Sequence, residues 1–216
     1  MNLELAREQM IGQQLRAWGV LDERILGVMR EVPRERFVPE EWAGVAYADA
    51  AIPVGHGKSL PAPKIHGRML HALDPRPGES VLEVGTGTGY LTACLARLAG
   101  HVTSVEIHPG LAEAARANLE AAGVRNVRLI VDDVFEMEFS RRYDVIAVNG
   151  SLPLRDDRFE RLLSIGGRLF EVEGAAPIMQ ARRVTRLGDS EWAREDLFET
   201  CLPPLENAPR PEAFVF

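Results

Sequence analysis

The chain has 216 residues, of which 46% are apolar and 26% charged, and its net charge is −7 from 25 basic and 32 acidic side chains. This length favours one domain with an appended segment over two full domains. The composition is typical of a globular protein that can bury a sizeable core. The acidic balance argues against a nucleic-acid-binding protein, which would usually carry a basic face.

Cysteines, histidines and apolar runs exclude further classes of protein. Two cysteines are too few for a disulfide scaffold and favour a reducing compartment. The five histidines form no metal-binding motif, so we expect no metal. No apolar run approaches the roughly 20 residues that span a membrane, and the charged N-terminus does not resemble a signal peptide. We therefore expect a cytoplasmic protein without nucleic-acid or membrane partners, and its oligomeric state stays open.

Apolar residues at helical spacing predict two helices near the N-terminus. The first covers residues 3–18, and the second is capped by Asp22 and ends before Pro33. Residues 33–63 are rich in proline and glycine and predict a loop with short extended pieces. A loop of this length inside a compact chain usually serves a function. A third helix is predicted over residues 65–73.

From residue 79 the chain alternates regularly between apolar runs and helical patterns. This alternation predicts a mostly parallel sheet with right-handed crossovers. The predicted strands cover residues 80–84, 101–106, 127–131, 143–148 and 168–172, and the predicted helices cover residues 88–98, 110–122 and 159–163.

The C-terminal part of the chain has a different pattern. Residues 180–186 and 195–200 flank a short turn and predict an antiparallel hairpin at the end of the sheet. The proline-rich tail from residue 202 is expected to be surface coil. We divide the chain into residues 1–78, which hold the N-terminal helices and the long loop, and residues 79–216, an α/β Rossmann-like core. Both parts are expected to pack as one compact domain.

A glycine-rich turn follows the first predicted strand of the core. It carries Gly85, Thr86, Gly87 and Gly89 and is preceded by an acidic residue, Glu83. Glycine lets the backbone turn sharply and lets a ligand approach without a Cβ in the way. The N–H groups of the helix that follows can hold an anionic group, such as the carboxylate of an amino-acid-like ligand.

Acidic residues end the next two predicted strands. Glu106 lies seventeen residues after Gly89, where a carboxylate can accept both hydroxyls of a ribose. Asp133 follows Asp132 at the end of the third strand, where a carboxylate can accept a hydrogen bond from the exocyclic amine of adenine. The turn and the two acids lie at the ends of three successive strands, which is where open α/β sheets bind ligands. Enzymes that use NAD prefer G-x-G-x-x-G, whereas this chain has Tyr90 at the last glycine position.

Four stretches make the pattern more specific, and together they resemble the protein-L-isoaspartate (D-aspartate) O-methyltransferases over about residues 5–187. These stretches are residues 32–39 (VPRERFVP), residues 46–49 and 52–55 (AYAD and IPVG), residues 82–90 (LEVGTGTGY) and residues 166–169 (GGRL). The resemblance implies a Rossmann-like methyltransferase fold and S-adenosyl-L-methionine as cofactor, held by Glu83, Gly85, Thr86, Gly87, Gly89, Glu106 and Asp133.

The resemblance also implies an activity and a partner. The family transfers a methyl group to the carboxylate of isoaspartyl residues in damaged proteins, and the ester then collapses to a succinimide that can reopen as aspartate. The partner would therefore be a protein or peptide that bears isoaspartate. A carboxylate is already ionised at neutral pH, so no general base is needed. Alignment and desolvation then suffice, which explains why no catalytic triad is present.

The loop that binds substrate in the family departs from its usual pattern here. An ungapped alignment places Ser59 at the family's threonine position and Pro61 at the position of the serine assigned to its active site. Proline has neither a hydroxyl nor a backbone N–H. Ser59 either replaces the missing hydroxyl in part or is an ordinary loop serine. Substrate contacts are also expected from Lys58, Asn149 and Ser151.

Several functions therefore stay open at the level of sequence. The first is the isoaspartyl methyltransferase, and the second is a divergent methyltransferase with another carboxylate or peptide acceptor, which Pro61 favours. A non-catalytic scaffold that keeps the cofactor fold is a third. Glu106 and the open turn argue against it, since a scaffold needs neither. An NAD-dependent dehydrogenase is a distant fourth.

Overall fold

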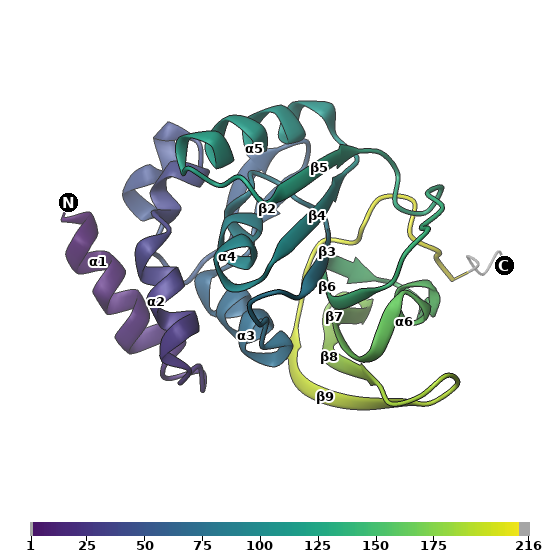
Figure 1. Cartoon of the computed structure of the whole chain (residues 1–216). Coiled ribbons are helices and arrows are strands. Elements are labelled where there is room, and N and C mark those ends of the chain that lie inside the picture. The colour runs from purple at the N-terminus through teal and green to yellow at the C-terminus, as the bar shows by residue number, and fades with distance from the viewer. Residues whose placement is uncertain (1, 212–216) are drawn as a thin grey trace, which may run out of the picture.

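A seven-stranded sheet forms the centre of the molecule, and a short hairpin lies apart from it (Figure 1). The computed structural model describes residues 2–211. The hairpin pairs β1 (Ile52–Gly55) with β2 (Lys58–Leu60). The large sheet is formed by β3 (Ser80–Val84), β4 (His101–Glu106), β5 (Val127–Val131), β6 (Tyr143–Leu152), β7 (Leu163–Ala175), β8 (Ile178–Arg186) and β9 (Trp192–Thr200).

The strand order in the large sheet is β5-β4-β3-β6-β7-β8-β9. Strands β3 to β7 pair in parallel, and β8 and β9 complete the sheet in antiparallel pairing. The predicted mostly parallel sheet with a C-terminal antiparallel hairpin is thereby confirmed. After β5 the chain returns to pair β6 with the other side of β3, so the strand order reverses between β3 and β6. Such a reversal leaves a crevice at the carboxyl ends of the strands.

The helices agree with the predicted ones within a few residues at most ends. The first predicted helix is divided into α1 (Leu3–Gln9) and a π-helical segment, Met10–Leu15. The predicted cap of the second is confirmed, because the Asp22 carboxylate accepts a hydrogen bond from the Arg24 N–H at 2.8 Å. The remaining helices are α2 (Glu23–Glu31), α3 (Pro63–Leu73), α4 (Tyr90–Leu98), α5 (Pro109–Ala121) and α6 (Arg158–Arg161). Over residues 2–211, no helix combines the length and apolarity needed to cross a membrane.

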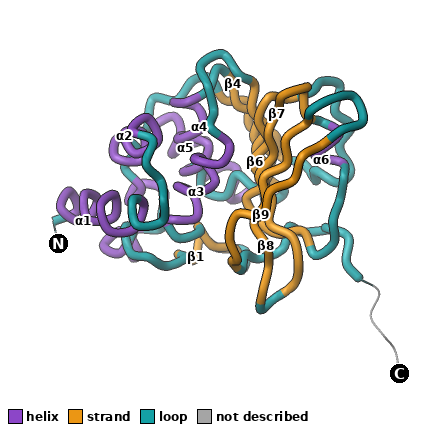
Figure 2. Tube along the Cα trace, turned by 90° about the horizontal axis from the view of Figure 1, so that it is seen from below, coloured by secondary structure: helices purple, strands orange, loops and turns teal. Residues whose placement is uncertain are grey.

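Alternate residues of the central strands enter two separate cores, as the two-residue period of a strand requires. On β3 and β6, Val81, Val145 and Ala147 face one core, while Leu82 and Ile146 face the other. Helices α1 to α5 cover the first face and α6 covers the second (Figure 2). Because both faces are covered, these strands read as continuous apolar runs, which is why their positions could be predicted.

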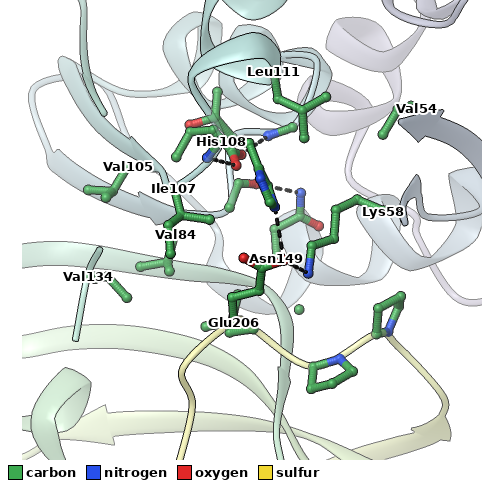
Figure 3. Close-up of a pocket in the computed structure, with 18 of the residues that line it drawn as sticks. Val54, Lys58, Val84, Val105, Ile107, His108, Leu111, Val134, Asn149 and Glu206 are labelled. Carbon is green, nitrogen blue, oxygen red and sulfur yellow. Dashed lines mark hydrogen bonds and ion pairs between the residues drawn. The ribbon is translucent and has the colours of Figure 1, made fainter. Parts of the chain in front are cut away.

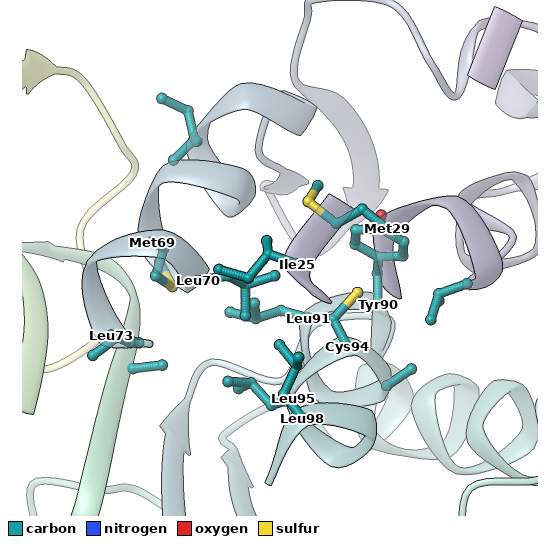
Figure 4. Packing of buried hydrophobic residues seen from close by; sticks show 14 of the residues in the cluster. Ile25, Met29, Met69, Leu70, Leu73, Tyr90, Leu91, Cys94, Leu95 and Leu98 are labelled. Carbon is teal, nitrogen blue, oxygen red and sulfur yellow. The ribbon is translucent and has the colours of Figure 1, made fainter. Parts of the chain in front are cut away.

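The N-terminal helices pack onto α4, which is buried along most of its length. Ile25 and Met29 of α2 meet Leu70 of α3 and Leu91 and Leu95 of α4 in one apolar layer (Figure 4). All five side chains are at most 1% exposed. This layer fixes α3, and with it the hairpin that precedes α3, against the parallel sheet.

The long loop of residues 33–63 contains more structure than the sequence indicates. It holds two 3-10 turns, Arg34–Phe37 and Glu40–Val45, before the β1–β2 hairpin. The prediction of short extended pieces is confirmed by this hairpin.

The C-terminal tail is coil over its described part, residues 202–211, as predicted, but it does not lie wholly at the surface. Leu202 and Ala208 are only 6% and 5% exposed. The Ser151 N–H donates to the Pro203 carbonyl at 3.0 Å, and the Leu205 N–H donates to the Ser151 carbonyl at 3.0 Å. Residues 202–206, here named the strap, therefore run beside the end of β6. Pairing with the strap and with β7 extends β6 to Leu152, beyond its predicted end at residue 148.

Candidate functional site

A groove of about 840 Å³ opens at the carboxyl ends of β3, β4, β5 and β6, at the reversal of strand order (Figure 3). Small molecules and cofactors commonly bind at such a reversal in open α/β sheets. The polar groups of its wall come from the glycine turn, the strand-end acids, the β1–β2 hairpin and the strap. Its apolar surface is formed by Val54, Val84, Val105, Ile107, Leu111, Val134 and Phe135.

The glycine turn adopts left-handed backbone conformations that favour glycine. Gly85, Gly87 and Gly89 have φ angles of 87°, 57° and 90°. A Cβ on Gly85 would lie 3.2 Å from the Asn149 carbonyl oxygen, and no atom lies within 4 Å of a Cβ built on Gly87. The turn is therefore tight against β6 at Gly85 and open at Gly87. Both glycines and Thr86 line the groove, whereas Gly89 lies behind it against α5.

Glu106 closes the turn from the end of β4. Its carboxylate accepts hydrogen bonds from the Gly87 N–H at 2.8 Å and from the His108 N–H at 3.0 Å. The side chain lines the groove and is nearly buried. A carboxylate has about four acceptor positions, so two remain for a bound ligand. Because the Gly87 N–H already donates to Glu106, it is not free to bind a ligand. The turn therefore provides space for a ligand and a fixed carboxylate acceptor.

Glu83 does not line the groove, although it immediately precedes the turn. It is fully buried and accepts hydrogen bonds from the Thr92 and Ser104 hydroxyls, the second at 2.7 Å. Burial raises the pKa of Glu83 to about 8, since no cation compensates the lost hydration. The Ser104 hydroxyl also lies 2.5 Å from that of Thr86. Glu83 thus supports the turn from behind and connects it to β4 and α4.

Asp132 and Asp133 end β5 at the rim of the groove. The Asp133 carboxylate accepts from the Phe135 N–H at 2.9 Å and from the Asn207 side-chain amide at 2.7 Å. The Asp132 carboxylate accepts from the Asp133 N–H at 2.8 Å. Asp132 is exposed and Asp133 is half-buried, and both keep acceptor capacity towards the groove.

The β1–β2 hairpin brings Lys58, Ser59 and Pro61 to the wall of the groove opposite the acids. The Pro61 carbonyl accepts a hydrogen bond at 2.6 Å from Arg34 Nη2. Arg34 also donates from Nε to the Ala46 carbonyl at 2.8 Å and lies over the Tyr90 ring. The structure therefore holds the backbone of the substituted position firmly through Arg34.

Arg34 belongs to a buried chain of polar side chains that the sequence analysis did not identify. Its Nη1 lies 3.4 Å from His66 Nδ1, and His66 Nε2 lies 3.3 Å from Asn149 Oδ1. A guanidinium only donates, so His66 Nδ1 accepts and Nε2 carries the proton. Burial, reinforced by Arg34, lowers the pKa of His66 to about 3, so its imidazole stays neutral. Asn149 then donates from Nδ2 to the Gly85 carbonyl at 3.0 Å, which fixes its orientation in the groove.

Ser151 lies outside the groove wall, unlike its neighbours Asn149 and Gly150. It is fully buried, and its hydroxyl donates to the Leu202 carbonyl at 2.9 Å. The structure thus brings Ser151 to the strap, where it holds the segment that borders the groove.

The structure adds His108 and the strap, with Glu206, to the groove. The strap has no apolar periodicity, and its place depends on hydrogen bonds to β6, so no local pattern predicts it. Arg34 lies within the VPRERFVP stretch, which was noted only as a mark of the family. His66 belongs to no sequence motif, and it is buried.

Comparison with known proteins gives a consistent assignment. Residues 6–205 match the family model described as protein-L-isoaspartate(D-aspartate) O-methyltransferase. A protein-L-isoaspartate O-methyltransferase from Magnetococcus marinus is 41% identical over 199 residues, which cover 92% of this chain and 86% of the relative. One from Methylorubrum populi is 39% identical and covers 94% of this chain and 95% of the relative.

Solved structures share the fold over nearly the whole chain. A beta-aspartate methyltransferase from Plasmodium falciparum, in complex with S-adenosyl-L-homocysteine, superposes with a TM-score of 0.80 and covers 93% of this chain and 98% of that one at 21% identity. A second structure, named as a protein-L-isoaspartate O-methyltransferase, gives a TM-score of 0.78 at 25% identity and covers 93% of this chain and 66% of that one.

Proposed function

Since the chain belongs to the protein-L-isoaspartate (D-aspartate) O-methyltransferase family, we propose that it repairs damaged proteins by methylating the carboxylate of isoaspartyl residues. It is an S-adenosyl-L-methionine-dependent methyltransferase of the protein carboxyl type. The single observation that carries the proposal is the continuous groove that joins the glycine turn, Glu106 and the β1–β2 hairpin.

The groove has the donor and acceptor set that this cofactor needs. Glu106, held by two backbone N–H groups, presents its remaining lone pairs for the ribose hydroxyls. Asp133 would accept a hydrogen bond from the adenine amine, and the apolar wall would pack against the ring. The open position at Gly87, next to Thr86, would leave room for the amino-acid end. Glu83 and Gly89 act indirectly, since they shape the turn from outside the groove.

The chemistry asks the protein for position more than for proton transfer. Bound S-adenosyl-L-methionine supplies an electrophilic methyl group, and an ionised carboxylate can accept it without a general base. The protein orients the acceptor and excludes water from it. The hairpin supplies one wall for the acceptor through Ser59, and Arg34 fixes the carbonyl of Pro61. His66 fixes Asn149 in the orientation that faces the groove.

Pro61 favours a second candidate function. A proline at the family's serine position removes one hydroxyl from the acceptor wall, so a methyltransferase with another carboxylate or peptide acceptor is the alternative. Both candidates use the same cofactor groove and differ only in what the hairpin recognises.

The test is transfer of labelled methyl groups from S-adenosyl-L-methionine to an isoaspartyl peptide and to its aspartyl twin. We expect the isoaspartyl peptide to be labelled and the twin to remain unlabelled. The variant Glu106→Ala serves as a control and should bind the cofactor roughly ten- to a hundredfold more weakly, as expected for loss of hydrogen bonds to a charged group. Labelling of neither peptide would favour the alternative acceptor.

A further inference from the structure

Three charged or polar side chains from distant segments meet over the groove (Figure 3). Lys58 Nζ lies 3.0 Å from Glu206 Oε1, and His108 Nε2 lies 3.1 Å from the same oxygen. Lys58 comes from the β1–β2 hairpin, His108 from the loop between β4 and α5, and Glu206 from the strap. Lys58 therefore pairs with one oxygen of a carboxylate that belongs to the protein itself, and His108 Nε2, which is buried and makes no hydrogen bond among the described residues, lies beside the same oxygen.

The two donors are held in place by the structure around them. The His108 imidazole stacks on that of His56, with ring centres 4.6 Å apart, and the His108 N–H is bound by Glu106. The side chains of His108 and Lys58 are 17% and 26% exposed, whereas that of Glu206 is 40% exposed. The hydrogen bond from Lys58 lowers the pKa of Glu206, so its carboxylate is ionised. The most exposed partner of the cluster is thus the acid.

Two members of the cluster, Lys58 and Glu206, belong to the hairpin and the strap, whereas His108 reaches them from the loop beside Glu106. Lys58 precedes Ser59 on β2, and Pro61 follows on the same wall. The strap that carries Glu206 contacts Gly150, next to Asn149, on the opposite wall. The hairpin lacks the hydroxyl expected at position 61, and a carboxylate that enters here meets Lys58 and His108 beside the hydroxyl of Ser59.

We propose that Lys58 and His108 form a carboxylate-binding site for the acceptor peptide, and that Glu206 occupies this site until the acceptor carboxylate displaces it. This inference rests on the proposed function, because it names how the same groove recognises its acceptor. Glu206 then acts as an internal competitor that selects for acceptors with a free carboxylate, and Lys58 and His108 are specificity-determining residues.

The experiment measures binding, so it does not depend on turnover. The protein is saturated with S-adenosyl-L-homocysteine, and the Kd of a fluorescently labelled isoaspartyl peptide is measured by anisotropy. Removing the competing charge in Glu206→Gln should lower this Kd about two- to fivefold, the range expected for a partly exposed ion pair. Lys58→Met and His108→Leu should raise it by a similar factor. In the double variant Lys58→Met/Glu206→Gln, the gain from Glu206→Gln should largely vanish, since contacting residues are not additive.

Two controls separate this site from other effects. Glu199→Gln, at an exposed position on β9, should leave the Kd unchanged. A peptide with the isoaspartyl carboxylate replaced by an amide should not gain affinity in Glu206→Gln. The affinity for S-adenosyl-L-homocysteine is measured in parallel, because its own carboxylate could use the same donors.

Three results would overturn the inference: an unchanged or higher Kd in Glu206→Gln, a change confined to the affinity for S-adenosyl-L-homocysteine, or no binding of the isoaspartyl peptide by any variant. If the wild type methylates the isoaspartyl peptide but the Kd of this peptide is unchanged in Glu206→Gln, only this inference fails and the proposed function stands.

Discussion

At position 61, a proline stands where the family resemblance places an active-site serine, and its backbone is anchored by Arg34 through the Pro61 carbonyl. Pro61→Ser should keep this anchor and add a hydroxyl and an N–H. Gain of one hydrogen bond to a charged group is worth about 1.5–3 kcal/mol, or roughly ten- to a hundredfold in rate. We expect faster methylation of an isoaspartyl peptide by Pro61→Ser, measured as kcat/KM, and an unchanged cofactor affinity.

Ser59 provides the matched variant. If Ser59 has replaced the missing hydroxyl, Ser59→Ala should lower kcat/KM by the same factor and Pro61→Ser should add little. Unchanged turnover in both variants, beside an inactive wild type, would assign the acceptor to another class of molecule.

The buried carboxyl of Glu83 makes stability depend on pH. Its pKa is raised to about 8 in the folded protein, whereas an unfolded glutamate titrates near 4.5. The folded state therefore keeps its proton where the unfolded state has lost it, so this contribution to stability is greatest below pH 4.5 and is lost as pH rises to 8. Glu83→Gln, which mimics the neutral acid, should reduce the fall in unfolding free energy between pH 6 and 9 by up to about 3 kcal/mol.

Chemical denaturation at several pH values measures this effect. Glu171 contributes in the same direction, because burial and Glu173 raise its pKa to about 8, so some pH dependence remains in Glu83→Gln. Glu199→Gln is the exposed control. Equal slopes in the wild type and in Glu83→Gln would contradict a neutral Glu83.

At the scale of single residues, the sequence predicted the strand-end acids better than it predicted the polar chain behind the hairpin. Glu106 and Asp133 follow apolar strands directly, so their place at the groove follows from topology. The places of Arg34 and His66 depend on how the loop folds over α3 and α4, and no local pattern records that. Glu83 is the reverse case. Its position beside the turn predicts a contact with the cofactor, but the alternation of side chains along β3 points it away from the groove, towards Thr92 and Ser104.

At the scale of elements, the strap borders the groove because Gly150 leaves room for it. A Cβ on Gly150 would lie 2.7 Å from Leu205 Cδ2 and 3.3 Å from the Pro203 carbonyl oxygen. Gly150→Ala should displace the strap, lower stability by about 1–3 kcal/mol as overpacking does, and raise KM for the peptide. Thermal unfolding and steady-state kinetics measure both effects.

The double variant Gly150→Ala/Leu205→Ala removes the main clash and should recover part of the lost stability. Gly12→Ala is the matched control, since nothing lies within 4 Å of its Cβ and its helical position should tolerate alanine. A Gly150→Ala protein with wild-type stability and KM would show that the strap does not depend on this contact.

Three of the parallel strands were predicted to the residue. The bounds of β3, β4 and β5 match the predicted ranges, because buried parallel strands are continuous apolar runs bounded by turns. Strand β6 was predicted too short, since Asn149, Gly150 and Ser151 carry no apolar signal and are extended by pairing with β7 and the strap. Where a strand ends can therefore depend on pairing with segments distant in the sequence, which local sequence patterns do not predict.

At the scale of the whole molecule, the N-terminal helices, the parallel sheet and the strap each contribute one wall or support of a single groove (Figure 1). In the function that we propose, the sheet supplies the cofactor side, and the hairpin and strap supply the acceptor side. This arrangement explains how one fold can bind a common methyl donor and still discriminate among acceptors, because the two sides are built from separate segments.

The central claim is that this groove repairs isoaspartyl residues, and the most direct measurement is conversion of an isoaspartyl peptide to its aspartyl form, followed by liquid chromatography and mass spectrometry. We predict that the aspartyl peptide accumulates over repeated turnovers only when S-adenosyl-L-methionine is present, with the methyl ester and the succinimide as transient species. If the isoaspartyl peptide persists unmodified in the presence of the cofactor, or if the aspartyl peptide is methylated equally well, the claim is contradicted.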